Sequence, residues 1–403
     1  FKRSPVEIAE TLAASIPEHA SLSEVTAING YLNFRVSPRW LASQLRNGAM
    51  ETTHEVSDRS VLIEHTSANP NGPFHVGRAR NAILGDTLVR LHRLWGHDVT
   101  AEYYVDDMGK QVAVLAWALE HLSQTDVETL LHDREASNPT WEGKADHQRV
   151  RWYQAAQKLR QDENEAPPIE KAIGELVHAS ENGDEGVLQA FEDAYQPVLD
   201  GMLETLGRLG IQFDRFTKES RFVTNGDVTA LMDELGALEI NGVADNGAQF
   251  LDLGARGLKG KTEFFYRRGD GSSLYATRDI AYHRWKWSMS NELINVLGED
   301  HKLQAKQVGL TLEELGHQRP EVVFYSFIKL PEGKMSTRQG NVVFMDDLLE
   351  EAKAQAGKVV SELRPDYEQE TIDQIAEAVG TSAVRFNIIN VSPEKGFSFR
   401  WED

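Results

Sequence analysis

The clearest pattern of apolar and polar positions in the chain predicts a strand, a helix and a second strand. Val61–Glu64 is a short apolar run, and Val99–Val105 is rich in β-branched and aromatic residues. Between them, a loop of Ser, Asn, Pro and Gly at Thr66–Pro73 leads into a helical pattern over His75–Trp95. This order is typical of the mononucleotide-binding half of a doubly wound parallel sheet.

Two later apolar runs, Leu293–Leu297 and Val322–Tyr325, are expected to continue the same sheet. Residues 110–190 are helical and highly charged, and residues 222–272 are rich in glycine and short strands. We interpret both stretches as insertions. Helical patterns dominate after Asp346. The predicted fold class is therefore α/β, a Rossmann-type doubly wound parallel sheet with helical and small α/β insertions.

Residues 1–57 form a separate small α+β pattern. A helix is expected around Val6–Leu12, and a second helix from Arg39 to Met50. Between them, Val25–Val36 contains two β-prone runs around Asn29-Gly30, which is a strong signal for a hairpin. We therefore expect three parts: this N-terminal domain, a catalytic domain over 58–345 and a helical segment over 346–403.

Composition excludes some classes of protein and leaves one question open. The 403 residues include no cysteine, which excludes disulfides and thiolate zinc sites and favours a reducing cytoplasm. No apolar stretch is long enough to span a membrane, and no signal peptide is visible. The chain starts without methionine, and both of its ends look cut.

The charge balance is strongly acidic, with 63 acidic residues against 42 basic ones and a net charge of −21. The basic residues are 16 Lys and 26 Arg. Taken alone, this balance argues against a nucleic-acid partner. Alternatively, the protein works in concentrated salt, where charges are screened within about 3 Å and local basic patches still bind RNA. Composition does not choose between the two.

The first motif with chemical content is Pro70–Arg78, Pro-Asn-Gly-Pro-Phe-His-Val-Gly-Arg. Glycine inside a first helical turn is unfavourable, so Gly77 needs a reason, and close approach of an adenine or ribose to the backbone supplies one. The helix N-terminus offers free amides to phosphates, and His75 can donate to a phosphate oxygen. By itself, however, His-x-Gly is more often an ordinary helix start.

The second motif is Lys334–Asn341, Lys-Met-Ser-Thr-Arg-Gln-Gly-Asn. A Lys, a Ser hydroxyl and an Arg on one loop could clamp a triphosphate. A solvated basic turn is the alternative, which a string this short favours. The two motifs are separated by 334 − 75 = 259 residues, which places one after the first strand and the other after the last strand of one sheet.

Together the motifs resemble the two signatures of class I aminoacyl-tRNA synthetases, His-Ile-Gly-His and Lys-Met-Ser-Lys-Ser. Four further segments of the chain resemble arginyl-tRNA synthetases, especially the archaeal type. The likeness runs from Gly30 to Trp401. This chain departs from the signatures at Arg78, in place of the second histidine, and at Thr337, in place of the second lysine. Arg78 could hold pyrophosphate as a fixed cation, and Arg338 or Lys334 could replace the missing lysine. The four segments that resemble arginyl-tRNA synthetases are Gly30–Phe34, Ile63–Pro73, Tyr103–Gln111 and Leu274–Ile280.

The resemblance implies a set of site residues. The implied catalytic residues are His75, Arg78, Lys334, Ser336 and Arg338. The implied ATP-binding residues are Pro70, His75, Gly77, Lys334, Met335 and Ser336. The guanidinium of arginine falls to Glu64, Tyr275 and Asp279, its α-amino group to Ser67 and Asn69, and His301 extends the pocket.

Physical reasoning supports the arginine pocket independently. A guanidinium is planar and always charged, so it requires carboxylates that accept paired hydrogen bonds and a flat wall for stacking. Glu64 ends the first strand, where open α/β sheets bind ligands. Tyr275 and Asp279 lie four residues apart at an expected helix start and would share one face. A helix cap or a surface ion pair is the ordinary alternative for Asp279.

The resemblance also implies substrates and partners: Mg-ATP, arginine and tRNA(Arg), whose terminal 2′-hydroxyl receives the arginyl group. Activation of arginine is expected to need bound tRNA, and the chain is expected to be a monomer without zinc. Tyr31, Asn33, Phe34 and Arg35 are candidate contacts to the tRNA elbow, with stacking aromatics, although Tyr31 and Phe34 could equally be core residues. Val391–Trp401 resembles the threshold of an anticodon-binding domain that is mostly absent, so weak tRNA binding and poor charging are expected.

Three rival classes remain. Cysteinyl-tRNA synthetases would need a thiolate-bound zinc, which a chain without cysteine cannot provide. Synthetases for branched aliphatic amino acids would need an apolar pocket, whereas this chain offers Glu64 and Asp279. A nucleotidylyltransferase shares the first signature but ordinarily lacks the long insertions. A non-catalytic tRNA- or partner-binding relative is disfavoured by the intact Lys334–Ser336 and His75–Gly77.

Overall fold

The computed structural model describes residues 3–46, 58–131, 141, 143–329 and 343–398. The chain divides into two compact units. The smaller contains Phe1–Ser57 and Leu94–Gly96, and the larger contains the rest of the chain. Each unit is described by itself.

The N-terminal unit has the predicted helix and hairpin. Helix α1 (Pro5–Ser15) starts with a capping box, in which Ser4 Oγ accepts from the Glu7 amide at 3.2 Å and a Glu7 carboxylate oxygen accepts from the Ser4 amide at 3.0 Å. Strands β1 (Leu22–Ile28) and β2 (Tyr31–Val36) are antiparallel.

Their turn confirms the hairpin signal, since Asn29 and Gly30 have φ angles of 52° and 85°. Helix α2 covers Pro38–Arg46. The end of the predicted helix, beyond Arg46, lies outside the described residues.

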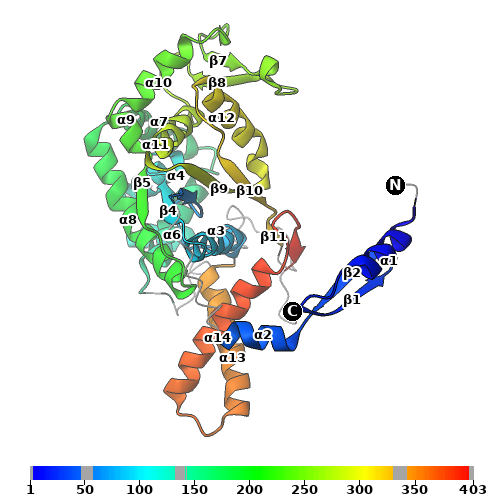
Figure 1. Ribbon diagram of the computed structural model, residues 1–403. Coiled ribbons are helices and arrows are strands. Elements are labelled where there is room, and N and C mark those ends of the chain that lie inside the picture. The colour runs from blue at the N-terminus through cyan, green and yellow to red at the C-terminus, as the bar shows by residue number, and fades with distance from the viewer. Residues whose placement is uncertain (1–2, 47–57, 132–140, 142, 330–342, 399–403) are drawn as a thin grey trace. The chain divides into compact units, whose positions relative to one another are not determined.

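A five-stranded parallel sheet forms the centre of the larger unit, in the order β10-β9-β3-β4-β5 (Figure 1). In chain order this is the Rossmann arrangement, with helices on both faces. The sequence predicted four of the five strands and missed β5, which has only four residues, two of them charged, and which lies at the sheet edge. The strands are β3 (Ser60–Glu64), β4 (Asp98–Val105), β5 (Arg215–Lys218), β9 (Glu292–Gly298) and β10 (Glu321–Tyr325).

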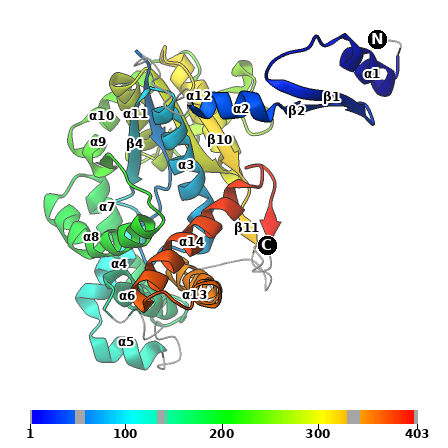
Figure 2. The ribbon, with the colours of Figure 1, turned by 60° about the horizontal axis from the view of Figure 1, so that its bottom comes forward.

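Side chains alternate between the two faces of the sheet along each strand, and a different helix covers each face. Helix α3 (Val76–Leu94) covers one face, where Ile63 and Val89 share an apolar cluster, and Figure 2 shows it lying along the sheet. Helix α11 (Tyr275–Met289) covers the other face, where Tyr104 and Tyr282 stack with ring centroids 4.1 Å apart. Ligands of such sheets bind at the carboxyl ends of the strands, between elements that diverge to opposite faces.

The described residues of the stretch interpreted as a helical insertion form helices joined by short turns, and the last helix runs on to Arg208. Because it connects two adjacent parallel strands, β4 and β5, it is also the crossover of the sheet. Its helices are α4 (Lys110–His121), α5 (Gln124–Leu131), α6 (Ala145–Leu159), α7 (Ala166–Glu181) and α8 (Glu185–Arg208).

The second stretch begins with two helices before its strands. A three-stranded antiparallel sheet follows, and then the chain returns to the main sheet through α11 and β9. The elements between β5 and β10 other than α11 and β9 are α9 (Ser220–Thr224), α10 (Asp227–Gly236), β6 (Asn241–Val243), β7 (Gln249–Asp252), η2 (Gly254–Arg256), β8 (Glu263–Arg267), η3 (Glu299–His301) and α12 (Lys302–Glu314).

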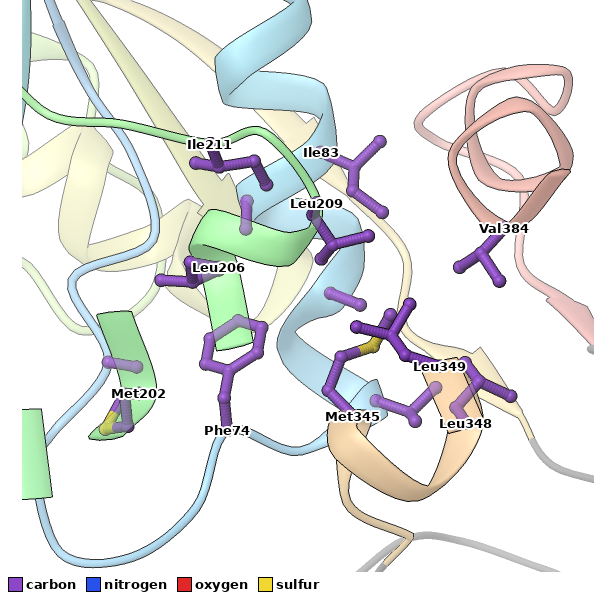
Figure 3. Packing of buried hydrophobic residues seen from close by; sticks show 14 of the residues in the cluster. Phe74, Ile83, Met202, Leu206, Leu209, Ile211, Met345, Leu348, Leu349 and Val384 are labelled. Atoms are coloured by element: carbon purple, nitrogen blue, oxygen red, sulfur yellow. The ribbon is translucent and has the colours of Figure 1, made fainter. Parts of the chain in front are cut away.

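The C-terminal part is a helical hairpin of α13 (Met345–Leu363) and α14 (Gln369–Ile389), as the helical pattern predicted. It lies in the same compact unit as the sheet. Figure 3 shows apolar side chains from α3, α8, α13 and α14 converging on one cluster, among them Ile83, Leu206, Leu349 and Val384. Two short parallel strands complete the part, β11 (Ile328–Lys329) and β12 (Phe397–Ser398).

A buried ion cluster joins the crossover to this hairpin. Lys144 Nζ lies 3.0 Å from Asp146 Oδ2, 2.8 Å from Asp346 Oδ2 and 2.6 Å from Thr205 Oγ1. His147 Nε2 lies 2.8 Å from the same oxygen of Asp346. The two carboxylates and His147 would otherwise resemble a metal site, but the lysine ammonium already occupies the centre of the cluster. It ties α6, α8 and α13 together.

Replacing Lys144 with methionine should destabilise the larger unit by about 3–5 kcal/mol, because two buried carboxylates lose their shared cation. Urea unfolding followed by circular dichroism measures the change. Lys171→Met is the control, since its side chain is 78% exposed and its ion pair to Glu175 spans 3.8 Å; it should cost less than about 0.5 kcal/mol. Equal losses in the two variants would contradict a structural role for the cluster.

Candidate active site

A cavity of about 1160 Å³ opens at the carboxyl ends of β3 and β9, where the sheet connections diverge. Its wall comes from three directions: the loop after β3 and the start of α3, the first turns of α11, and the ends of β9 and β10. Of the residues predicted to bind ligands, nine line it: Glu64, Ser67, Asn69, His75, Gly77, Arg78, Tyr275, Asp279 and His301.

Other predicted residues lie elsewhere. Pro70 is buried and is not among the lining residues, so its side chain does not face the cavity. Lys334, Met335, Ser336, Thr337 and Arg338 fall outside the described residues. Tyr31, Asn33, Phe34 and Arg35 belong to the N-terminal unit, where all four are exposed.

The loop after β3 begins with a strained turn. Thr66 and Ser67 have φ angles of 70° and 39°, in the left-handed region that side chains other than glycine disfavour. Asn81 on α3 holds this turn, because its Oδ1 accepts from the Thr66 amide at 2.8 Å and its Nδ2 donates to the Val296 carbonyl at 3.0 Å. As a result Ser67 Oγ accepts from the Tyr104 amide at 3.1 Å and lies at the cavity edge.

The first signature is joined by its backbone to the residues that follow the second. The amide of Val76 donates to the Val343 carbonyl at 3.1 Å, and the amide of Met345 donates to the Phe74 carbonyl at 2.7 Å. His75 and Phe344 form an isolated β-bridge between these bonds. Segments that are far apart in sequence, Phe74–Val76 and Val343–Met345, therefore meet beside the cavity.

His75 is neutral near pH 7. Burial, assisted by the charge of Arg78, lowers the pKa of His75 to about 4. Its Nδ1 is buried without a hydrogen-bond partner among the described residues. A neutral imidazole can donate one hydrogen bond to a ligand, whereas the permanent charge at this helix start belongs to Arg78.

Glu64 has a partner that the sequence did not indicate. Lys286 Nζ lies 2.6 Å from Glu64 Oε2, and the lysine side chain is fully buried. The ammonium also donates to Asn295 Oδ1 at 2.9 Å. Ser67 Oγ approaches the other carboxylate oxygen of Glu64 at 3.4 Å. The carboxylate is thus held in one orientation, with Oε1 less fully satisfied than Oε2.

The second carboxylate is connected to the same network. His283 Nδ1 lies 3.0 Å from Asp279 Oδ1, and His283 Nε2 lies 2.7 Å from Asn295 Nδ2. Burial alone would raise the pKa of Asp279, but the charges of His283 and Lys286 and the hydrogen bonds from His283 and Gln304 together outweigh burial, and the pKa is lowered. Asp279 is therefore ionised at neutral pH.

A signal for the missed residues was present in the sequence. Tyr275, Asp279, His283 and Lys286 follow the spacing i, i+4, i+8 and i+11, which places them on one helical face. The first two were singled out and the other two were not. Asn295 gave no such signal, since it interrupts an apolar strand by one polar residue.

Asn69 also takes part in a polar network at the cavity. Its Nδ2 lies 3.2 Å from Asp106 Oδ2 and 3.2 Å from Gln111 Oε1. Burial raises the pKa of Asp106. These bonds fix the Asn69 side chain, and its Oδ1 has no hydrogen-bond donor among the residues that the structure describes, so it could accept from a ligand group.

This sheet order, with a cavity at its switch point beside the first signature segment, is that of the catalytic domain of a class I aminoacyl-tRNA synthetase. The family model for "tRNA synthetases class I (R), catalytic domain" matches residues 41–401. The arginine–tRNA ligases of Methanocella arvoryzae and Methanothermobacter thermautotrophicus are 42% and 40% identical to the chain. Each alignment covers the whole chain and 69% of the relative.

Solved structures agree. The arginyl-tRNA synthetase of Thermus thermophilus superposes with a TM-score of 0.74 at 25% identity, over the whole chain and 70% of that protein. The Plasmodium falciparum arginyl-tRNA synthetase shares the fold, with a TM-score of 0.67 at 15% identity, over 98% of this chain and 66% of that one. The chain belongs to the arginyl-tRNA synthetase family.

Asn81→Ala should destabilise the larger unit by about 1–3 kcal/mol, because a buried amide and a buried carbonyl lose their partners and the strained turn loses its anchor. Urea unfolding tests this. Asn182→Ala, at the exposed end of α7, is the control and should change stability by less than about 0.5 kcal/mol. An unchanged unfolding free energy for Asn81→Ala would show that the turn at Thr66 and Ser67 is stable without the Asn81 side chain.

Proposed function

We propose that the chain activates arginine with ATP to form arginyl-adenylate and pyrophosphate, and then transfers the arginyl group to the terminal 2′-hydroxyl of tRNA(Arg). In the first step the arginine carboxylate attacks the α-phosphorus of ATP in line. No side-chain nucleophile is needed, since positioning and charge stabilisation perform the catalysis. Family membership supports ATP, arginine and tRNA as substrates.

One observation carries the choice of arginine: two carboxylates, Glu64 and Asp279, line the same cavity and are linked through Lys286, Asn295 and His283. We assign the substrate guanidinium to these carboxylates, with Tyr275 as the flat wall. The pocket would reject lysine, because an ammonium cannot fill two paired acceptor positions as a guanidinium does.

The other end of the substrate is assigned to the loop after β3. Ser67 and Asn69 would hold the α-amino group, since both line the cavity within reach of Glu64 or Asp106. His301, exposed on η3, extends the cavity wall.

The nucleotide is assigned to the start of α3. Gly77 allows close approach of the adenosine, His75 donates to a phosphate oxygen, and Arg78 holds the pyrophosphate. Lys334, Met335, Ser336 and Arg338 would complete the phosphate clamp, with Mg²⁺ bound to the triphosphate. Arg78 and Thr337 stand in place of the second histidine and the second lysine of the two signatures. These substitutions change which side chain carries each charge and leave the reaction the same.

Contacts to tRNA are assigned to β2 of the N-terminal unit. Tyr31 and Phe34 are 74% and 54% exposed, which favours a stacking role over a core role within that unit. Asn33 and Arg35 lie on the same strand. We further propose a monomer that acts in the cytoplasm without zinc. Among the described helices, none has the length and apolar character needed to cross a bilayer.

Asp279→Asn should raise the KM for arginine in ATP–pyrophosphate exchange by about 100-fold, because one charge-assisted pair of hydrogen bonds, worth about 2–3 kcal/mol, is lost. The KM for ATP should change little. Exchange is measured with tRNA(Arg) present, and with lysine and citrulline as competing substrates.

Asp270→Asn is the matched control, since Asp270 lies in an exposed turn and does not line the cavity. Its kinetic constants should equal those of the wild type. Exchange supported by another amino acid, or no exchange with arginine in the wild-type protein, would sink the proposed function.

The acidic composition supports a second proposal, that the protein is adapted to concentrated salt. At a net charge of −21, self-repulsion is strong at low ionic strength and is screened within about 3 Å at 1 M salt. We expect the melting temperature to rise steeply between 0.1 and about 3 M KCl. Sucrose controls for general stabilisation by excluded solutes. A melting temperature that is indifferent to KCl would contradict salt adaptation.

A further inference from the structure

Arg80 lies on α3 two residues after Arg78, and its side chain is completely buried. Its guanidinium donates to four backbone carbonyls. Nη1 lies 2.7 Å from the Ser326 oxygen and 2.6 Å from the Lys395 oxygen, and Nη2 lies 3.1 Å from Val391 and 2.6 Å from Ser392. These acceptors belong to Ser326, directly after β10, and to the segment after α14.

These two segments are also bonded to each other. The Ser326 amide donates to the Pro393 carbonyl at 2.9 Å, and Ser326 Oγ donates to the Glu394 carbonyl at 2.7 Å. Next to them, β11 pairs with β12 in parallel, at the red end of the ribbon in Figure 1. A segment at the end of the described chain is therefore built into the end of the sheet.

The same segments form part of the cavity wall. Ser326, Phe327, Ile328 and Gly396 line it, on the side of β10. Arg78 lines it from α3, on the helix that carries Arg80. A guanidinium suits this junction because its planar fork can satisfy several carbonyls at fixed angles, which a lysine ammonium cannot do.

We propose that Arg80 is a positioning residue for the nucleotide half of the cavity. It holds the wall of Ser326–Ile328 and Gly396 against α3, and so makes the segment after α14 part of the site of adenylate formation. Arg80 does not itself line the cavity. The inference rests on the proposed function in one respect, the assignment of the α3 side of the cavity to ATP.

Arg80→Lys and Arg80→Gln test the proposal in ATP–pyrophosphate exchange. Both should raise the KM for ATP at least about tenfold, equivalent to 1.4 kcal/mol. The KM for arginine should stay within about twofold, because the Glu64–Asp279 side of the cavity keeps its contacts. Direct calorimetric titration of ATP should show the same weakening without any amino acid.

Arg149→Lys and Arg149→Gln are the matched controls. Arg149 Nη1 also donates to two carbonyls, those of Asp193 at 2.8 Å and Ala194 at 3.0 Å, but it does not line the cavity. These variants can lose stability, yet they should leave the KM for ATP unchanged. Active-site titration separates a loss of folded enzyme from a change in KM.

If the Arg80 variants do not fold, Ser326→Ala removes one bond of the same junction and should raise the KM for ATP about two- to threefold, since one neutral hydrogen bond is worth about 0.5–1.5 kcal/mol. An unchanged KM and calorimetric affinity for ATP in folded Arg80 variants, or in Ser326→Ala, would overturn the positioning role. Absence of arginine-dependent exchange in the wild type would instead overturn the proposed function, and the titration of ATP would still decide the role of Arg80.

Discussion

The parallel pairing of β3 with β9 is the constraint on which the site depends. β3 continues into α3 on one face of the sheet, while β9 continues through η3 into α12, which packs with α11 on the other face. The backbone diverges above the shared carboxyl ends and leaves a cavity that no neighbouring strand fills. The strained turn at Thr66 and Ser67 follows from the same constraint, because the chain must leave β3 sharply to begin α3 beside the cavity.

Buried cations fix the segments that this arrangement brings together. Lys286 reaches Glu64 across 222 residues of chain, Arg80 reaches Lys395 across 315, and Lys144 reaches Asp346 across 202. Desolvation offsets much of the attraction in such contacts, so they are poor sources of net stability. Breaking one is costly, however, because the remaining charge or carbonyls stay buried without a partner. Lys286 therefore fixes Glu64 at the cavity before any substrate arrives, and Lys144 fixes the crossover to the C-terminal hairpin.

The proposed arginine pocket contains its own cation. Lys286 neutralises part of the charge of Glu64, while Asp279 stays ionised beside His283. Two bare carboxylates in one cavity would repel each other and raise each other's pKa. The lysine removes that conflict and orients Glu64, so a guanidinium bound as proposed would meet a pocket that is acidic and in which one oxygen of Glu64 already has a partner.

The strongly acidic composition pointed away from RNA, and the family to which the chain belongs shows how weak that indication is. Net charge sums over the whole surface, whereas binding depends on local groups and on the salt in which the protein works. The motifs carried the information that composition lacked, because each motif specifies residues that must meet one ligand.

By itself the sequence determined four strands of the main sheet, the family, and nine of the residues that line the cavity. The apolar runs at β3, β4, β9 and β10, the Asn29-Gly30 turn and the signature residues are local signals, and each follows from side-chain periodicity or backbone preference. The apolar pattern did not predict β5, because a strand at the sheet edge that contains Arg215 and Lys218 need not be apolar. Only the tertiary structure decided the partners, such as Lys286 for Glu64, Asn81 for Thr66 and Arg80 for the segment after α14. Such partners are set by which distant segments pack together, and that depends on the whole core at once and on no local pattern.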